Sequence, residues 1–459
     1  MSEDRSLLWA PLAWVGGRWR DAVLLRVGAD GHWADVVVGV VAPAEASVLP
    51  GPALPGMVDA HSHAFQRAFA GLAERRTGGH DDFWSWRDRM YDVALRITPA
   101  QLRAVGAQLY AELLHGGYTQ ISEFHYLQHA PDGQPYADPL ELSWALADAA
   151  TETGIGLTVL PVLYERAGFA EPALRRDQRR FATSADGVLA LYRGLRDSHR
   201  SLLTAGVAIH SLRAATPAAI ARLVAPLGDV PIHIHVAEQT GEVADCLTAT
   251  GERPIEWLIR HAALDARWQL VHATQSTPTE IVAVARTGAG VVLCPSTEAN
   301  LGDGLVDLPG WLGAGVPLSI GSDSQVTRSW CDELRLVEYG QRLHLRQRNV
   351  AASPDQGEPA TAARLLERAL HGGGVAAGFK RWGLVAGARA DLLVIDTSDG
   401  GLLGAPSRHL LDSLVFSTPG RPFRDVMVGG RWVVRDHRHP READIARLFV
   451  EAMQELWPG

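Results

Sequence analysis

The chain has 459 residues, of which 47% are hydrophobic and 21% are charged, values that suit a globular protein with a sizeable core. Its net charge of −9 argues against a nucleic-acid partner, because basic residues must contact the phosphates of such a partner. Three widely spaced cysteines, Cys246, Cys294 and Cys331, indicate neither a disulfide framework nor a thiolate metal site.

The start of the chain, MSEDRSLL, has acidic residues where a signal peptide would have basic ones, and no apolar run approaches the length of a membrane span. We therefore expect a cytoplasmic protein that does not bind membranes. Because twofold symmetry is the most common symmetry of soluble oligomers, we expect a homodimer.

Both ends of the chain predict β-structure. Residues 6–54 contain short apolar runs separated by Gly, Asp and Pro, which is typical of antiparallel strands and turns. Residues 383–396 and 424–434 repeat the pattern, with a hairpin signal at Gly429 and Gly430. We expect residues 1–55 and 381–459 to form the two parts of a small β-sandwich, with a helix at the C-terminal end.

Between these ends, residues 56–380 alternate eight strand-like apolar runs with longer segments of helical period, as parallel βα units do. The runs are residues 55–63, 117–126, 154–164, 206–213, 230–238, 268–274, 290–297 and 316–324. Polar residues cluster at their carboxyl ends, where a (β/α)8 barrel builds its active site. The predicted fold class is therefore α/β, a (β/α)8 TIM-like barrel with a small β-sandwich domain built from both chain ends.

Several of these strand ends carry potential metal ligands. His61 and His63 lie two residues apart on the first strand, so both project from the same face. With His235 on the fifth strand and Asp323 on the eighth, they can hold one divalent ion and leave a position for water, which suits zinc. Iron and manganese accept the same ligands. His233 shares the face of His235, but His235 is nearer the carboxyl end and is the ligand that we favour.

Strands one, five, six and eight carry, in this order, the motifs HxH, HxxE, a single His and SD. Together these motifs resemble those of the amidohydrolase superfamily, specifically its mononuclear deaminase branch. The resemblance covers nearly the whole chain. Binuclear members of the superfamily bridge two metals with a lysine on strand four, or with a carboxylate in the same role. Here the only lysine, Lys380, lies beyond strand eight, so a lysine-bridged pair of metals is excluded.

A closer resemblance is to the N-formimino-L-glutamate deiminase family, carried by the segments HSHAFQR, FWSWRDRMY, SEFHY, HSLR, HVAEQ and STEANLGDG. It implies a hydrolase of histidine degradation that converts the small molecule N-formimino-L-glutamate and water to N-formyl-L-glutamate and ammonia. One divalent metal ion, with zinc as the first choice, would be its cofactor.

The resemblance also implies roles for individual residues. Asp323, with His272 beside it, is expected to accept a proton from the attacking water, and Glu238 to protonate the terminal nitrogen that leaves. The residues expected to contact the substrate are Gln66, Arg87, Tyr126, His210 and Arg213. The two arginines suit a substrate with two carboxylates, because a guanidinium group binds a carboxylate through two parallel hydrogen bonds.

Two other functions stay open at this point. The same ligands serve deaminases of amino-heterocycles such as guanine or adenosine derivatives, whose flat substrates need stacking surfaces like Phe83, Trp84 or Trp86. We expect those aromatic residues to form a loop that partly covers the site. A barrel without any chemistry is the other alternative, but it predicts a missing ligand or acid, and none of these residues is missing.

Overall fold

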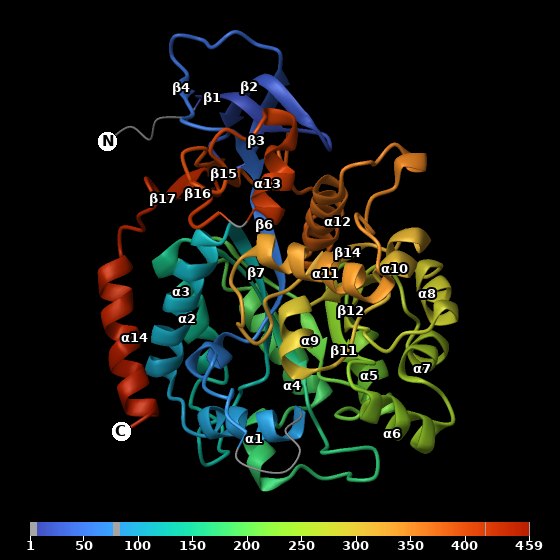
Figure 1. The fold of residues 1–459 in the computed structure, drawn as a ribbon. Coiled ribbons are helices and arrows are strands. Elements are labelled where there is room, and N and C mark those ends of the chain that lie inside the picture. The colour runs from blue at the N-terminus through green and yellow to red at the C-terminus, as the bar shows by residue number, and fades with distance from the viewer. Residues whose placement is uncertain (1–6, 77–82, 418, 459) are drawn as a thin grey trace.

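The computed structural model describes residues 7–76, 83–417 and 419–458, with residues 83–85 described by their backbone alone. The strands of these ranges form two sheets: one curls into a barrel, and the other lies at one end of it (Figure 1). The barrel comes from the middle of the chain and the second sheet from both ends, which confirms the predicted fold class. Within the same ranges, every helix is too short or too polar to cross a membrane.

In the described part of the chain, eight parallel strands make the barrel and pair in chain order. They are β6 (Met57–Ser62), β7 (Tyr118–His125), β8 (Gly156–Leu163), β10 (Val207–Ile209), β11 (Ile232–Val236), β12 (Trp268–His272), β13 (Gly290–Leu293) and β14 (Leu318–Ile320), and a short β9 (Leu203–Ala205) pairs with β8. Each predicted apolar run contains one of the eight. These strands are buried along their whole length, as expected when helices cover the outside of a parallel sheet.

The last barrel strand meets the first through the residues that follow it. The backbone N–H of Asp323 donates to the carbonyl of His61 at 2.9 Å, and the N–H of His63 donates to the carbonyl of Asp323 at 3.2 Å. The barrel therefore closes at three of the predicted metal ligands.

Helices surround the barrel strands (Figure 1). They are α2 (Pro99–His115), α3 (Glu141–Thr153), α4 (Ala185–Arg196), α5 (Pro217–Val224), α6 (Thr240–Thr250), α7 (Pro254–His261), α8 (Pro278–Ala285), α9 (Pro295–Leu301), α10 (Leu308–Ala314), α11 (Trp330–Leu345) and α12 (Thr361–Ala376). Helices α2, α5 and α8 each begin at a Thr-Pro pair, and the side chains of Thr98, Thr216 and Thr277 accept a backbone N–H of the first turn. Such pairs are strong start signals, because threonine caps the helix and proline already has a helical φ.

The second sheet joins the two ends of the chain. Its N-terminal strands are β1 (Leu7–Trp14), β2 (Trp19–Val27), β3 (Trp33–Val38), β4 (Ser47–Val48) and β5 (Ala53–Pro55), and its C-terminal strands are β15 (Leu392–Ile395), β16 (Phe423–Val428) and β17 (Arg431–Val434). Strand β5 pairs antiparallel with β15. The predicted hairpin joins β16 to β17, with φ of 53° at Gly429 and 76° at Gly430, and a tight turn with two positive φ angles favours glycine.

The carboxyl ends of the barrel strands open away from this sheet, toward helix α1 (Phe83–Ala94) (Figure 1). We expected a loop at residues 83–86, and that expectation is wrong, because these residues begin α1. The buried Met90, Val93 and Ala94 have the spacing of one helix face. At the C-terminal end, α13 (Leu410–Phe416) is followed by α14 (Glu442–Leu456), the expected terminal helix, which packs on α2.

A buried arginine connects the second sheet to the barrel. Arg389 donates to the carboxylate of Asp391 through Nε at 2.9 Å and Nη2 at 2.6 Å. It also donates to Oε1 of Gln120 at 2.7 Å and to the carbonyl of Thr119 at 3.0 Å, both on β7. Because Asp391 is itself buried, the arginine is the group that neutralises its charge.

We expect Arg389→Ala to lower the free energy of unfolding by about 3–5 kcal/mol, the usual cost of leaving one member of a buried ion pair without its partner. Urea denaturation followed by circular dichroism measures the loss. Arg26→Ala is the matched control, because the pair of Arg26 with Asp35 is more than half exposed and should contribute about 0–1 kcal/mol. Equal losses in the two variants would show that the buried pair contributes no more to the free energy of unfolding than the exposed pair does.

Candidate functional site

Three buried histidines meet where the barrel closes. His61 and His63 lie at the end of β6 and His235 lies on β11, and one ring nitrogen of each is within 4.8 Å of the others. The Nε2 atoms of His61 and His235 are only 3.0 Å apart. Burial lowers the pKa of His61 and His235 well below the usual range and that of His63 to about 3. The three rings are therefore neutral and can offer lone pairs to a cation.

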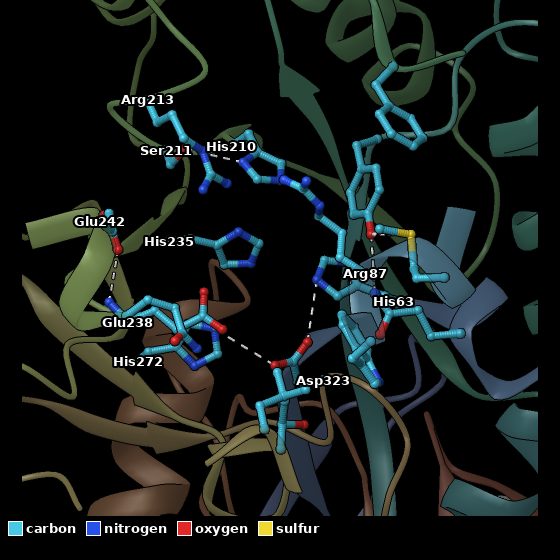
Figure 2. Close-up of a pocket in the computed structure, with 18 of the residues that line it drawn as sticks. His63, Arg87, His210, Ser211, Arg213, His235, Glu238, Glu242, His272 and Asp323 are labelled. Carbon is cyan, nitrogen blue, oxygen red and sulfur yellow. Dashed lines mark hydrogen bonds and ion pairs between the residues drawn. The ribbon is translucent and has the colours of Figure 1, made fainter. Parts of the chain in front are cut away.

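Asp323 adds a carboxylate to this cluster. Its Oδ1 is 3.6 Å from Nε2 of His61 and 3.4 Å from Nε2 of His63. Its other oxygen, Oδ2, is 3.7 Å from Nε2 of His272 (Figure 2). Burial raises the pKa of Asp323 to about 7, so a nearby cation is needed to keep the carboxylate fully ionised at neutral pH. One carboxylate thus lies between the three histidines and His272.

The donor set fits one divalent ion, because three imidazole nitrogens and one carboxylate oxygen are typical ligands of catalytic zinc. Nδ1 of His63 donates to the carbonyl of Phe124 at 3.0 Å, which leaves its Nε2 facing the cluster. His233 is not part of the cluster, since its Nε2 is 2.8 Å from the carbonyl of Ala376. Lys380 is exposed beyond α12 and lies outside the site.

The backbone around the cluster is unusual. Asp323 and His272 have φ of 48° and 69°, a left-handed conformation that residues other than glycine rarely adopt and that concentrates at functional sites. At Gly321 a Cβ atom would lie 2.7 Å from both Cβ and the carbonyl oxygen of His61. Only glycine therefore lets the end of β14 approach β6 closely enough to bring Asp323 to the histidines.

Glu238 and His272 lie beside Asp323 on the acidic side of the site (Figure 2). Oε1 of Glu238 is 3.7 Å from Nε2 of His272, and Oε1 of Glu298 is 3.4 Å from its Nδ1. Burial lowers the pKa of His272, but the carboxylates of Glu238, Glu298 and Asp323 outweigh this effect and bring the pKa to about 10. His272 therefore has a proton to share with the carboxylates around it.

Sequence reasoning missed two buried glutamates that support these groups. Glu298 on α9 contacts His272, and Glu242 on α6 accepts the N–H of Ala237 at 3.1 Å and of Glu238 at 2.9 Å. Ala237 has a left-handed φ of 51°, so Glu242 holds the turn that presents Glu238. The available signals were the four-residue spacing from Glu238 to Glu242 and the position of Glu298 within the STEANLGDG segment.

The opposite wall of the cavity carries positive charge. Arg87 comes from α1, while His210 and Arg213 follow β10, and all three line the cavity across from Glu238 and Asp323 (Figure 2). Burial lowers the pKa of Arg87, and the positive charges of Arg175 and Arg213 lower it further. The cavity thus has one basic and one acidic wall.

Gln66 and Tyr126, the two remaining residues expected to contact substrate, line the same cavity. Nε2 of Gln66 donates to the hydroxyl of Tyr126 at 3.1 Å. Trp86 also lines the cavity, and its ring packs on Phe69 with centroids 5.5 Å apart. The side chains of Phe83 and Trp84 lie outside the described residues, so the expected stacking surface and cover over the site stay predictions.

Comparisons with known proteins agree with this geometry. Residues 53–433 match the model of the amidohydrolase family. The chain is 46% identical over 453 residues to formimidoylglutamate deiminase of Pseudomonas aeruginosa, an alignment that covers 98% of this chain and 99% of the relative. It is 29% identical over 404 residues to 5-methylthioadenosine/S-adenosylhomocysteine deaminase of Natronomonas pharaonis, covering 87% and 85% of the two chains.

Among solved structures, an amidohydrolase from Brucella melitensis is similar over almost the whole chain. The TM-score is 0.93 at 41% sequence identity, and the superposition covers 98% of this chain and 99% of the other. The likeness therefore includes the barrel and the sheet built from the chain ends.

Proposed function

Because this chain belongs to the amidohydrolase family, we propose that it hydrolyses N-formimino-L-glutamate to N-formyl-L-glutamate and ammonia. The observation that carries this proposal is the cavity with a basic wall at Arg87 and Arg213 and an acidic wall at Glu238. The substrate has the matching polarity, with a nitrogen-rich formimino group at one end and two carboxylates on its glutamate part. Full-length identity of 46% to a formimidoylglutamate deiminase supports the same substrate.

The family is metal-dependent, and we propose that His61, His63, His235 and Asp323 hold one divalent ion, with zinc as the first choice. When bound, such an ion supplies a water of lowered pKa, so that a nucleophile is available near pH 7. The ligand geometry supports the site, since the three ring nitrogens lie within 4.8 Å of one another and Oδ1 of Asp323 is 3.6 Å from Nε2 of His61 and 3.4 Å from Nε2 of His63.

Side chains of the site carry out the proton transfers of the reaction. Oδ2 of Asp323, with His272 beside it, accepts the proton of the attacking water. The resulting tetrahedral carbon carries two nitrogens, either of which can leave once it is protonated. Glu238 protonates the terminal nitrogen, so ammonia departs and the formyl group stays on the glutamate nitrogen. The separations of 3.7 Å from His272 to both Glu238 and Asp323 support transfer of a proton between these groups.

We expect His235→Gln to lose bound metal, because an amide is a poor ligand where a neutral imidazole nitrogen is needed. His233→Gln is the matched control, since His233 lies two residues away and contacts the Ala376 carbonyl instead of the cluster. Metal analysis of the two purified variants by mass spectrometry tests the assignment. Stoichiometric metal in His235→Gln would contradict it.

An ammonia-release assay of the metal-loaded protein tests the proposed reaction against its main alternative. We expect rapid release from N-formimino-L-glutamate and none from guanine, adenosine, cytosine or S-adenosylhomocysteine. Release from a heterocycle alone would favour an amino-heterocycle deaminase, the function named for the relative at 29% identity. The homodimer, the cytoplasmic location and the choice of zinc stay predictions, and light scattering, cell fractionation and metal analysis test them.

A further inference from the structure

A buried tyrosine outside the predicted set lines the basic wall of the cavity. Tyr164 directly follows β8, and its ring packs edge-on against His210 with centroids 4.5 Å apart. Burial raises the pKa of Tyr164, while the positive charges of Arg213 and Arg87 lower it. Tyr164 therefore shares a wall of the cavity with His210, and Arg87 and Arg213 line that cavity as well.

Hydrogen bonds fix the direction of the Tyr164 hydroxyl proton. Oε1 of the buried Gln178 accepts the backbone N–H of Arg175 at 3.0 Å, so the amide nitrogen of Gln178 must face the other way. That nitrogen donates to the hydroxyl oxygen of Tyr164 at 2.9 Å. Because the hydroxyl oxygen is already an acceptor from Gln178, its own proton points elsewhere.

The position of Tyr164 is also fixed by its backbone. Its N–H donates to Oγ1 of Thr183 at 2.7 Å, and its carbonyl accepts the N–H of Thr183 at 3.0 Å. Within the described ranges, no protein group accepts the hydroxyl proton, and guanidinium groups nearby can only donate. A preorganised donor of this kind beside two arginines is complementary to an anion.

We propose that the Tyr164 hydroxyl donates a hydrogen bond to one of the two substrate carboxylates that Arg87 and Arg213 bind, and so helps to select dicarboxylate substrates. This inference rests on the proposed function. It adds a neutral donor to the two charged ones, and it assigns Gln178 the role of holding that donor in the correct orientation. Because the proposed contact is to a carboxylate and not to the reacting carbon, Tyr164 should affect substrate binding and the transition state equally.

The test is Tyr164→Phe, which keeps the ring packing and removes the donor. Loss of a hydrogen bond to a charged group should raise KM for N-formimino-L-glutamate by about 10- to 150-fold. Turnover number, metal content and melting temperature should stay close to those of the unmodified protein, since uniform binding affects KM alone. Tyr110→Phe is the matched control, because it removes a buried tyrosine hydroxyl on α2, outside the cavity.

Three results would overturn the inference. An unchanged KM in Tyr164→Phe, with an active unmodified protein, would reject the contact while the proposed function stands. A joint fall in turnover number, metal content and melting temperature would assign Tyr164 a purely structural role. If the unmodified, metal-loaded protein releases no ammonia from N-formimino-L-glutamate, both the proposed function and this inference fail.

Discussion

Glu238→Gln is expected to lower the turnover number for N-formimino-L-glutamate by about 10²- to 10⁴-fold, the usual contribution of a positioned general acid. Glutamine has nearly the same shape as glutamate, so the turn held by Glu242 and the contact near His272 should persist. What the amide cannot do is transfer a proton to the leaving nitrogen. Metal content should therefore stay stoichiometric while the turnover number falls.

The products of the slow variant sharpen this test. Without an acid directed at the terminal nitrogen, cleavage of the other carbon–nitrogen bond becomes competitive, and the share of glutamate and formamide should rise. Chromatography of the products alongside a turnover assay measures both effects. Asp245→Asn, at an exposed position of α6, is the control for loss of a carboxylate in the same element. Near-normal turnover in Glu238→Gln would reject its role as the acid.

Sequence patterns predict the barrel because its strands are buried on both faces and are therefore continuously apolar. The same reasoning predicts the ligands, since residues near the carboxyl ends of different strands meet at one rim. Position along the strand also distinguishes His235 from His233, which the structure places against Ala376, away from the cluster. The features that could be predicted are thus those set by strand periodicity.

Features that depend on contacts between distant segments were not predictable in this way. The approach of Glu298 to His272 and the bond from Gln178 to Tyr164 depend on how the segments after β13 and β8 fold against the rim. No composition rule indicates the left-handed φ of Ala237, an ordinary residue for a helix or strand. Helix α1 was missed for a related reason, because only packing against the barrel identifies Met90 and its neighbours as one buried face.

Arg213→Met is expected to lower kcat/KM for N-formimino-L-glutamate by about 30- to 4,000-fold, because removing one member of a buried charged contact typically costs about 2–5 kcal/mol. Methionine keeps most of the volume of the arginine stem and removes only the charged group. Since Arg213 is not among the ligand residues, metal content should not change. Arg222→Met is the control, because the pair of Arg222 with Asp186 on the surface is about two-thirds exposed.

Arg87→Met extends this test to the second carboxylate. If each arginine binds one carboxylate, the two single variants should weaken binding by different amounts for analogues that lack the α- or the γ-carboxylate. Each variant should be insensitive to loss of the carboxylate that its missing arginine would have bound. Should both variants use N-formimino-L-glutamate normally, the dicarboxylate assignment is wrong, even if metal binding and the role of Glu238 stand. A neutral amino-heterocycle would then be the better substrate class, because its recognition does not require two guanidinium groups.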